Sequence, residues 1–177
     1  MSLESLTSHL RVVEDFPVKG IHFYDVTTLF KDADSLRELV DILYEKYKDR
    51  GITKVVGIES RGFVVGAALA VRLGAGFIMA RKPGKLPAET ISYSYAKEYG
   101  TDTIEIHKDA ISPDDVVLLH DDLLATGGTM IAALELVKQF NPKDVVVNFL
   151  IELRCEGLHG REAFPEGTEV DTILTLG

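Results

Sequence analysis

The stretch VVLLHDDLLATGGT, from Val116 to Thr129, joins a short apolar run to an acidic pair and a glycine loop. The run from Val116 to Leu119 has the length and apolar character of a strand buried on both faces. A helix pattern begins at Met130, so the glycine loop connects a strand to a helix. In open α/β sheets, ligands bind at the carboxyl ends of the strands, which is where such a loop lies. The stretch therefore predicts an α/β fold with a ligand site at one edge of its sheet.

The rest of the chain alternates helix and strand patterns around that stretch. Apolar residues three or four positions apart predict helices, and Asp34 or Ser35 is the expected cap of the first. The expected elements are, in chain order, a helix over 34–49, a strand over 54–58, a helix over 63–73, strands over 77–80 and 116–119, a helix over 130–140, and strands over 145–150 and 170–176. This order predicts a mostly parallel sheet flanked by helices. Because no repeat or linker interrupts it, we expect one domain over 1–177.

Residues 90–107 differ from this alternation. Two β-prone runs, Thr90 to Tyr95 and Thr103 to Ile106, flank a polar segment that contains Gly100. This pattern predicts an exposed β-hairpin or a mobile flap.

The composition excludes several classes of protein. A net charge of −9 disfavours nucleic acid as a partner. The one dense basic stretch, Arg81 to Lys85, suits one or two phosphates, although a solvated loop can have the same composition. No apolar run approaches the roughly 20 residues that cross a bilayer, and the N-terminus lacks the pattern of a signal peptide. Cys155 is the single cysteine, which rules out an intrachain disulfide. We expect a cytoplasmic protein that binds neither nucleic acid nor membrane.

The loop from Ala125 to Thr129 has the properties of a phosphate site. Gly127 and Gly128 lack side chains that would keep an anion from the backbone, and the helix start adds partial positive charge. Thr126 and Thr129 add hydroxyl donors. Asp121 and Asp122 would repel a phosphate, so they need ribose hydroxyls or a magnesium ion as their partner. Taken alone, the TGGT turn is also a plain strand-to-helix connection, but the acidic pair before it favours a ligand. Neither GxxxxGK[ST] nor GxGxxG is present, so the two common nucleotide motifs do not apply.

The segment resembles the phosphoribosyl-diphosphate signature of the type I phosphoribosyltransferases, in the form typical of their adenine phosphoribosyltransferase branch. Further matches follow in order along the chain: Asp15 to Pro17 with Gly20 and Phe23, Glu59 to Phe63, Arg81 to Pro87, Tyr93 and Ser94 with Glu98 to Gly100, and Gly160 to Glu162. The resemblance implies the type I phosphoribosyltransferase fold, with a small N-terminal hood over about 1–33 and a flexible β-hairpin flap over about 90–107.

The resemblance also implies a reaction of purine salvage. Phosphoribosyl diphosphate, with Mg²⁺ as cofactor, reacts with adenine to give AMP and pyrophosphate. The sugar becomes cationic as the bond breaks, while negative charge moves onto the departing pyrophosphate. The chain is expected to act as a homodimer.

Each motif takes a role by this resemblance. The 5′-phosphate is held by Ala125, Thr126, Gly127, Gly128 and Thr129, and the ribose and Mg²⁺ by Asp121 and Asp122, directly or indirectly. The pyrophosphate is bound by Glu59, Ser60, Arg61, Arg81, Lys82 and Lys85, with Arg61 also catalytic. The bond Glu59–Ser60 is expected to be a cis peptide. Glu98, followed by Tyr99 in the flap, is the catalytic carboxylate that handles the purine proton.

The base site is expected at Ile21, His22, Phe23 and Tyr24, with Phe23 stacking on the purine. Here the sequence departs from the family, which has Arg at the position of Tyr24 and an aliphatic residue at that of His22. His120 and Cys155 are interpreted as structural and packing residues, since neither has a suitable partner nearby in sequence.

Two alternatives remain open. One is a phosphoribosyltransferase acting on a 6-oxopurine such as hypoxanthine, guanine or xanthine. The other is a regulator that keeps the fold and senses phosphoribosyl diphosphate without turnover; it would need a DNA-binding module or a basic face.

Overall fold

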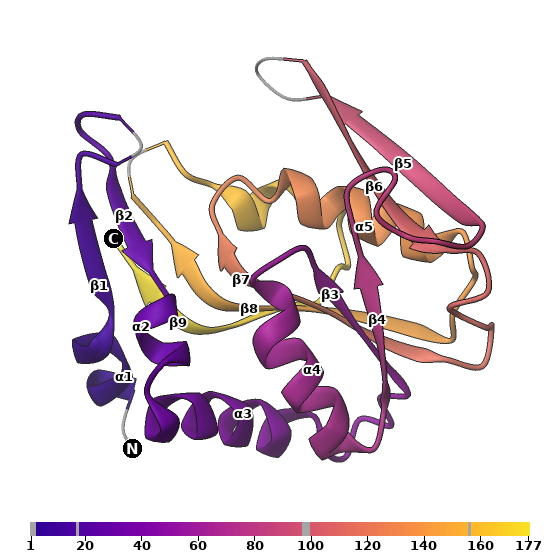
Figure 1. Cartoon of the computed structure of the whole chain (residues 1–177), viewed down its shortest axis with the longest axis horizontal. Coiled ribbons are helices and arrows are strands. Elements are labelled where there is room, and N and C mark those ends of the chain that lie inside the picture. Colours follow the sequence, from indigo (N-terminus) through magenta and orange to yellow (C-terminus); the bar gives the residue numbers. More distant parts are fainter. Residues whose placement is uncertain (1–2, 17, 97–99, 156) are drawn as a thin grey trace.

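The computed structural model describes residues 3–16, 18–96, 100–155 and 157–177. Five parallel strands form the central sheet in the order β4-β3-β7-β8-β9 (Figure 1). Their bounds are β3 Lys54–Ile58, β4 Gly76–Ala80, β7 Val116–Leu124, β8 Asp144–Leu153 and β9 Val170–Leu176. The expected α/β class with a parallel sheet is confirmed.

Helices cover both faces of the sheet, because the strands are apolar on both sides. One core cluster packs α3 (Ala33–Tyr47) and α4 (Gly62–Leu73) against one face, together with Leu6 of α1 (Leu3–His9) and Leu29 of α2 (Thr27–Phe30). A second cluster packs α5 (Gly128–Lys138) against the other face. Among the described residues, no helix has both the length and the apolar character to cross a bilayer.

Two antiparallel hairpins stand outside the sheet. The hood hairpin pairs β1 (Arg11–Glu14) with β2 (His22–Asp25), and the flap hairpin pairs β5 (Thr90–Ala96) with β6 (Thr101–His107). The carboxyl ends of β3, β7 and β8 point to the side of the molecule that lies between the two hairpins (Figure 1). The predicted hairpin in residues 90–107 is confirmed. The hood strands were not predicted, because their short runs mix exposed and half-buried side chains.

Two boundaries differ from the expectation. Helix α3 is capped by Asp32, whose carboxylate accepts a hydrogen bond from the backbone of Ser35 at 2.8 Å, so the expected caps Asp34 and Ser35 lie inside the helix. Strand β7 continues to Leu124, because its pairing with β8 continues beyond Leu119, with Phe149 opposite Asp121 and Glu152 opposite Leu124. The acidic pair therefore lies within a strand, where its backbone geometry is fixed by the sheet.

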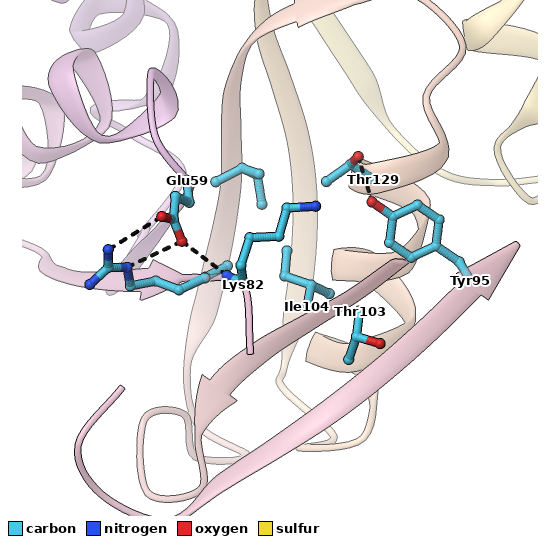
Figure 2. A pocket seen from close by; sticks show the side chains of 9 residues that line it. Glu59, Lys82, Tyr95, Thr103, Ile104 and Thr129 are labelled. Atoms are coloured by element: carbon cyan, nitrogen blue, oxygen red, sulfur yellow. Dashed lines mark hydrogen bonds and ion pairs between the residues drawn. The ribbon is translucent and has the colours of Figure 1, made fainter. Parts of the chain in front are cut away.

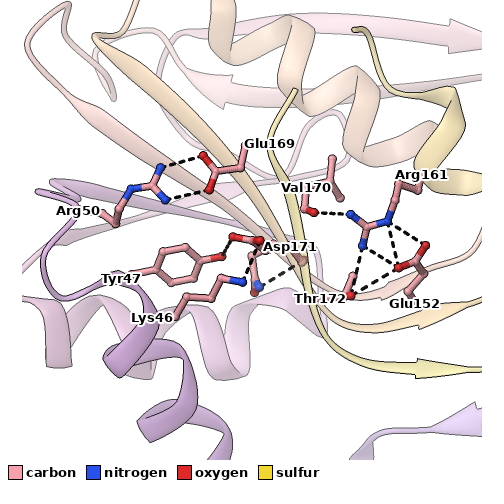
Figure 3. Close-up of polar contacts among 10 residues, drawn as sticks. Lys46, Tyr47, Arg50, Glu152, Arg161, Glu169, Val170, Asp171 and Thr172 are labelled. Atoms are coloured by element: carbon pink, nitrogen blue, oxygen red, sulfur yellow. Dashed lines mark hydrogen bonds and ion pairs between the residues drawn. The ribbon is translucent and has the colours of Figure 1, made fainter. Parts of the chain in front are cut away.

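Polar contacts join β9, and the residue before it, to α3 and to the turn that follows α3 (Figure 3). The hydroxyl of Tyr47 donates to Asp171 at 2.9 Å, and Lys46 pairs with the same carboxylate at 2.8 Å. Arg50 forms two parallel bonds of 2.8 Å with Glu169. These contacts hold β9, the edge strand that pairs with β8, against the end of α3.

Candidate active site

The glycine loop has the geometry of an anion site. Gly127 has a φ of +82°, which only glycine adopts readily, and its carbonyl accepts the first hydrogen bond of α5, from Ile131 at 2.9 Å. The loop turns its backbone around a hollow of about 120 Å³, which Asp121, Leu123 and Phe149 also line. Helix α5 begins at Gly128, so its N-terminus lies at this hollow.

The short 3₁₀ turn η1 (Gly160–Ala163) supports this loop from outside. A Cβ atom at Gly160 would lie 2.3 Å from the carbonyl oxygen of Ala125, and one at Gly127 would lie 3.1 Å from the carbonyl oxygen of Gly160. The two backbones are therefore in direct contact. Two glycines, one on each side, permit this approach.

Asp122 is buried and Asp121 is half-buried, and their surroundings disfavour the charged form of both carboxyl groups. Asp122 is 3% exposed, and its Oδ2 lies 2.8 Å from Nε of Arg61. Burial raises the pKa of both carboxyl groups above the usual value; the neighbouring charge of Asp122 raises that of Asp121 further, whereas Arg61 opposes the rise for Asp122. Hydroxyl donors or a cation at this point would relieve the repulsion.

Magnesium fits this donor set when a ligand shares it. Apart from its ion pair with Arg61, the buried Oδ2 of Asp122 accepts no hydrogen bond from the described residues, and carboxylate oxygens are the ligands that Mg²⁺ prefers. Within those residues no group of three or more His, Cys, Asp or Glu side chains converges. The protein therefore offers carboxylates but no complete metal cage, as expected where phosphate oxygens supply the other ligands.

The turn between β3 and α4 lies against the acidic pair. The Glu59–Ser60 bond is cis, as the resemblance implies, and Arg61 follows it as the cap residue of α4. A Cβ atom at Gly62 would lie 2.8 Å from the carbonyl oxygen of His120, so this glycine allows the helix start to meet β7. The sheet order, with β3 next to β7, thus brings Arg61 to Asp122.

Glu59 holds the start of the basic loop. Its carboxylate accepts hydrogen bonds from the guanidinium of Arg81 at 3.2 and 3.3 Å and from the backbone of Lys82 at 2.9 Å (Figure 2). Burial disfavours its charge, but these hydrogen bonds outweigh burial and hold its pKa below the usual value. Arg81 also donates to the carbonyl of Lys85 at 3.4 Å. All these residues lie at one edge of the sheet.

Two flap residues that the sequence did not single out reach this edge. Lys82 forms an ion pair with Asp102 of β6, and the hydroxyl of Tyr95 of β5 lies 2.8 Å from that of Thr129 (Figure 2). The partners of the first contact are 20 positions apart in the chain, and those of the second are 34 positions apart. The only signal for these contacts in the sequence was the position of Tyr93 and Tyr95, two residues apart on the strand and so on one face of it.

The hood presents one aromatic ring to the site. Phe23 lies under the guanidinium of Arg61, 5.6 Å from the ring centroid, and packs edge-on against Phe16 at 5.1 Å. Tyr24, the next residue on the strand, packs instead against the core cluster. His22 pairs with Glu14 at 2.9 Å, and Ile21 is half exposed.

The remaining predicted residues divide into three cases. Glu98 and Tyr99 lie outside the described residues. His120 is fully buried, its Nδ1 lies 2.8 Å from the amide oxygen of Asn148, and burial lowers its pKa to about 4, so it is neutral at physiological pH, as a structural residue should be. Cys155, in the loop after β8, is exposed, so the packing role expected for it is wrong.

Comparisons with known proteins agree with this geometry. The family model described as "Phosphoribosyl transferase domain" matches residues 25–171. An adenine phosphoribosyltransferase of Phocaeicola vulgatus is 67% identical over 176 residues, which are 99% of this chain and 100% of that protein. Among solved structures, the adenine phosphoribosyltransferase of Rhodothermus marinus has a TM-score of 0.90 at 50% identity over 98% of each chain. The enzyme of Giardia lamblia, complexed with 9-deazaadenine, has a TM-score of 0.91 at 40% identity over 99% of this chain and 98% of its own.

Proposed function

This chain belongs to the phosphoribosyltransferase family, and on that premise we propose how its residues divide the work of the reaction. The reaction is that of adenine phosphoribosyltransferase: adenine and phosphoribosyl diphosphate give AMP and pyrophosphate in purine salvage. One observation carries the assignment of roles. The ion pair of 2.8 Å between Arg61 and Asp122 joins the turn after β3 to the acidic pair before the phosphate loop.

The 5′-phosphate occupies the loop from Ala125 to Thr129. Backbone N–H groups at the start of α5 and the hydroxyls of Thr126 and Thr129 donate to its oxygens. The positive end of the helix stabilises the same charge by about 0.3–1 kcal/mol. This contact fixes the ribose with its hydroxyls toward β7.

Asp121 and Asp122 accept hydrogen bonds from the ribose hydroxyls. Burial raises the pKa of both carboxyl groups although Arg61 pairs with Asp122, and ribose hydroxyls would supply further hydrogen bonds to them. Mg²⁺ bound by substrate oxygens, with these carboxylates beside it, would neutralise the charge of the diphosphate. Arg61 keeps Asp122 oriented while this happens.

The pyrophosphate leaves toward the turn from Glu59 to Arg61 and the basic loop. Arg61, Arg81, Lys82 and Lys85 are the cations around it, and Glu59 orients Arg81 through two hydrogen bonds. Such fixed charges stabilise a leaving group more strongly in its charged transition state than before bond cleavage. Their preorganisation lowers the barrier to bond cleavage.

Adenine lies under the hood, with Phe23 as the stacking ring. Phe23 adjoins Arg61, whereas Tyr24 packs into the core, so Phe23 is the ring placed to cover a base attached to the ribose. The backbone of Ile21 and His22 reads the purine edge. Glu98, carried by the flap, handles the purine proton as N9 attacks the sugar.

The flap closes over the reacting centre and excludes water, which would otherwise capture the ribosyl cation. The active unit is a homodimer, and the enzyme acts in the cytoplasm. Light scattering coupled to gel filtration tests the dimer, and a monomer mass with full activity would contradict it.

Product analysis tests the function. The protein is incubated with phosphoribosyl diphosphate, Mg²⁺ and adenine, hypoxanthine, guanine or xanthine in turn, and the nucleotide formed is measured. We expect AMP from adenine and little product from the 6-oxopurines. Nucleotide formed only from a 6-oxopurine would overturn the base assignment. If no base gives a nucleotide, the result favours a regulator that binds phosphoribosyl diphosphate without turnover.

A further inference from the structure

Tyr95 joins the flap hairpin to the phosphate loop. It lies near the end of β5, and its hydroxyl is 2.8 Å from the hydroxyl of Thr129 in the first turn of α5 (Figure 2). Its ring packs against the second core cluster and lies over the backbone of Gly128, where a Cβ atom would be 3.9 Å away. The flap therefore contacts the phosphate loop through the side chain of Tyr95.

The same hydroxyl also reaches the second strand of the hairpin. It donates to Asp102 Oδ2 at 3.3 Å, and Asp102 forms an ion pair with Lys82 of the basic loop. A line of polar contacts thus runs from Thr129 through Tyr95 and Asp102 to Lys82. A hollow of about 10 Å³, roughly the size of one water, lies among Tyr95, Thr129 and Lys82.

The hydrogens of the two hydroxyls determine whether the bond between Tyr95 and Thr129 survives when a phosphate binds. Each hydroxyl has one hydrogen and two lone pairs. While Tyr95 donates to Asp102, it accepts from Thr129. When a phosphate oxygen takes the hydrogen of Thr129, Tyr95 can still donate to the oxygen of Thr129. The bond between hairpin and loop therefore persists when the phosphate site is filled.

We propose that Tyr95 is a positioning residue of the transfer reaction, holding the flap hairpin on the loaded phosphate loop through its bond to Thr129. The inference rests on the proposed function, in which Thr129 binds the 5′-phosphate. Glu98 follows Tyr95 by three positions in the chain, so the placement of the hairpin affects the chemical step. Tyr95 acts through Thr129 and touches no reacting atom.

Tyr93 provides a matched control on the same strand. It lies two positions earlier, so its side chain points to the same face of β5, and it packs against the same core cluster. Its hydroxyl forms no hydrogen bond with the described residues. Tyr95→Phe and Tyr93→Phe each remove one hydroxyl and keep the ring. Comparison of the two variants therefore separates the effect of the bond to Thr129 from the effect of ring packing.

Steady-state kinetics with a double-mutant cycle provide the first test. We expect Tyr95→Phe to lower kcat about three- to tenfold, the range for one neutral hydrogen bond, with KM for phosphoribosyl diphosphate changed less than about twofold. Tyr93→Phe should leave both constants unchanged. In a Thr129→Val background, Tyr95→Phe should cause a clearly smaller loss, because the bond to Thr129 is already absent and only the longer one to Asp102 is removed.

Hydrogen exchange provides a second test that does not depend on turnover. Ribose 5-phosphate should slow exchange in peptides covering residues 90–107 of the wild type and of Tyr93→Phe, and should slow it less in Tyr95→Phe. The proposal is overturned if Tyr95→Phe retains wild-type kcat, or if its loss is as large in the Thr129→Val background. If the wild type forms no AMP, the proposed function fails instead, and the exchange experiment alone decides whether Tyr95 holds the hairpin on the loop.

Discussion

Gly160 lies directly against the backbone of Ala125. A Cβ atom at Gly160 would lie 2.3 Å from the carbonyl oxygen of Ala125 and 2.8 Å from the side chain of Leu124. Because one of these neighbours is backbone, it cannot move aside without shifting the loop. The turn after β8 is therefore part of the support of the phosphate site, although no side chain of that turn is assigned to the ligand.

Gly160→Ala should weaken binding of phosphoribosyl diphosphate. Overpacking of this kind costs about 1–3 kcal/mol, which corresponds to an increase in KM of about five- to 150-fold, with little change in KM for adenine. Initial-rate kinetics with each substrate varied would measure this. Glu162→Ala, an exposed position of the same turn, is the control. Equal effects of the two changes would contradict the role of Gly160.

Glu152 fixes that turn and should make stability depend on pH. Its buried carboxylate lies 2.6 Å from Nη2 of Arg161 (Figure 3) and 3.1 Å from Nε of Arg154. The hydrogen bond from Arg161 is the largest cause that holds the pKa of Glu152 below its usual value of 4.5. Glu152→Gln should lower the free energy of unfolding at pH 7 by about 1–2 kcal/mol, since Arg161 is partly exposed.

The sign of the pH effect follows from the lowered pKa. The stabilisation by ionised Glu152 is present above the unfolded pKa, near 4.5, and is lost as pH falls through the lower folded value. Urea unfolding between pH 3 and pH 8 should therefore show the wild type and Glu152→Gln converging in acid. Glu166→Gln, an exposed change, should follow the wild type throughout. A difference that grows as pH falls would be contrary to this assignment.

Arg61 should be needed for turnover more than for folding. Arg61→Ala removes the partner of Asp122 and a leaving-group cation, and we expect kcat to fall by about 10²- to 10³-fold. Arg72 offers the closest comparison on the same helix, since it pairs with Asp41 at 2.7 Å and lies 4.7 Å from the ring of Tyr44. Arg72→Ala should retain activity; a similar loss in both variants would assign Arg61 to structure only.

Glu98 should carry acid–base chemistry. Glu98→Gln is expected to lower kcat by about 10²- to 10⁴-fold, without a change in thermal unfolding temperature. Glu89→Gln, at the exposed base of the hairpin, serves as the control. Unaltered turnover in Glu98→Gln would remove this residue from the mechanism.

Phe23 should contribute to recognition of the base alone. Stacking of a base on an aromatic ring is worth about 1–3 kcal/mol, so Phe23→Ala should raise KM for adenine by about tenfold and leave KM for phosphoribosyl diphosphate nearly unchanged. Both constants come from the same initial-rate assay. A change confined to phosphoribosyl diphosphate would place Phe23 outside the base site.

The sequence by itself determined the parts of this protein that depend on neighbouring residues. Apolar runs and helix periodicity predicted the strands of the sheet and the helices between them, because burial of a strand or a helix face is a local pattern. The glycine loop and the acidic pair were readable for the same reason, since the whole signal lies between Val116 and Thr129. The resemblance to the family added the reaction.

The tertiary structure decided which distant residues meet. Arg61 pairs with Asp122 because β3 lies next to β7 in the sheet, although the chain between them contains another strand and a hairpin. Tyr95 meets Thr129, and Gly160 meets Ala125, through the packing of elements that no local pattern places together. The same holds for Tyr24, which faces the core while Phe23 faces Arg61. Side-chain partners across a sheet depend on strand order and register, and only the folded chain fixes these.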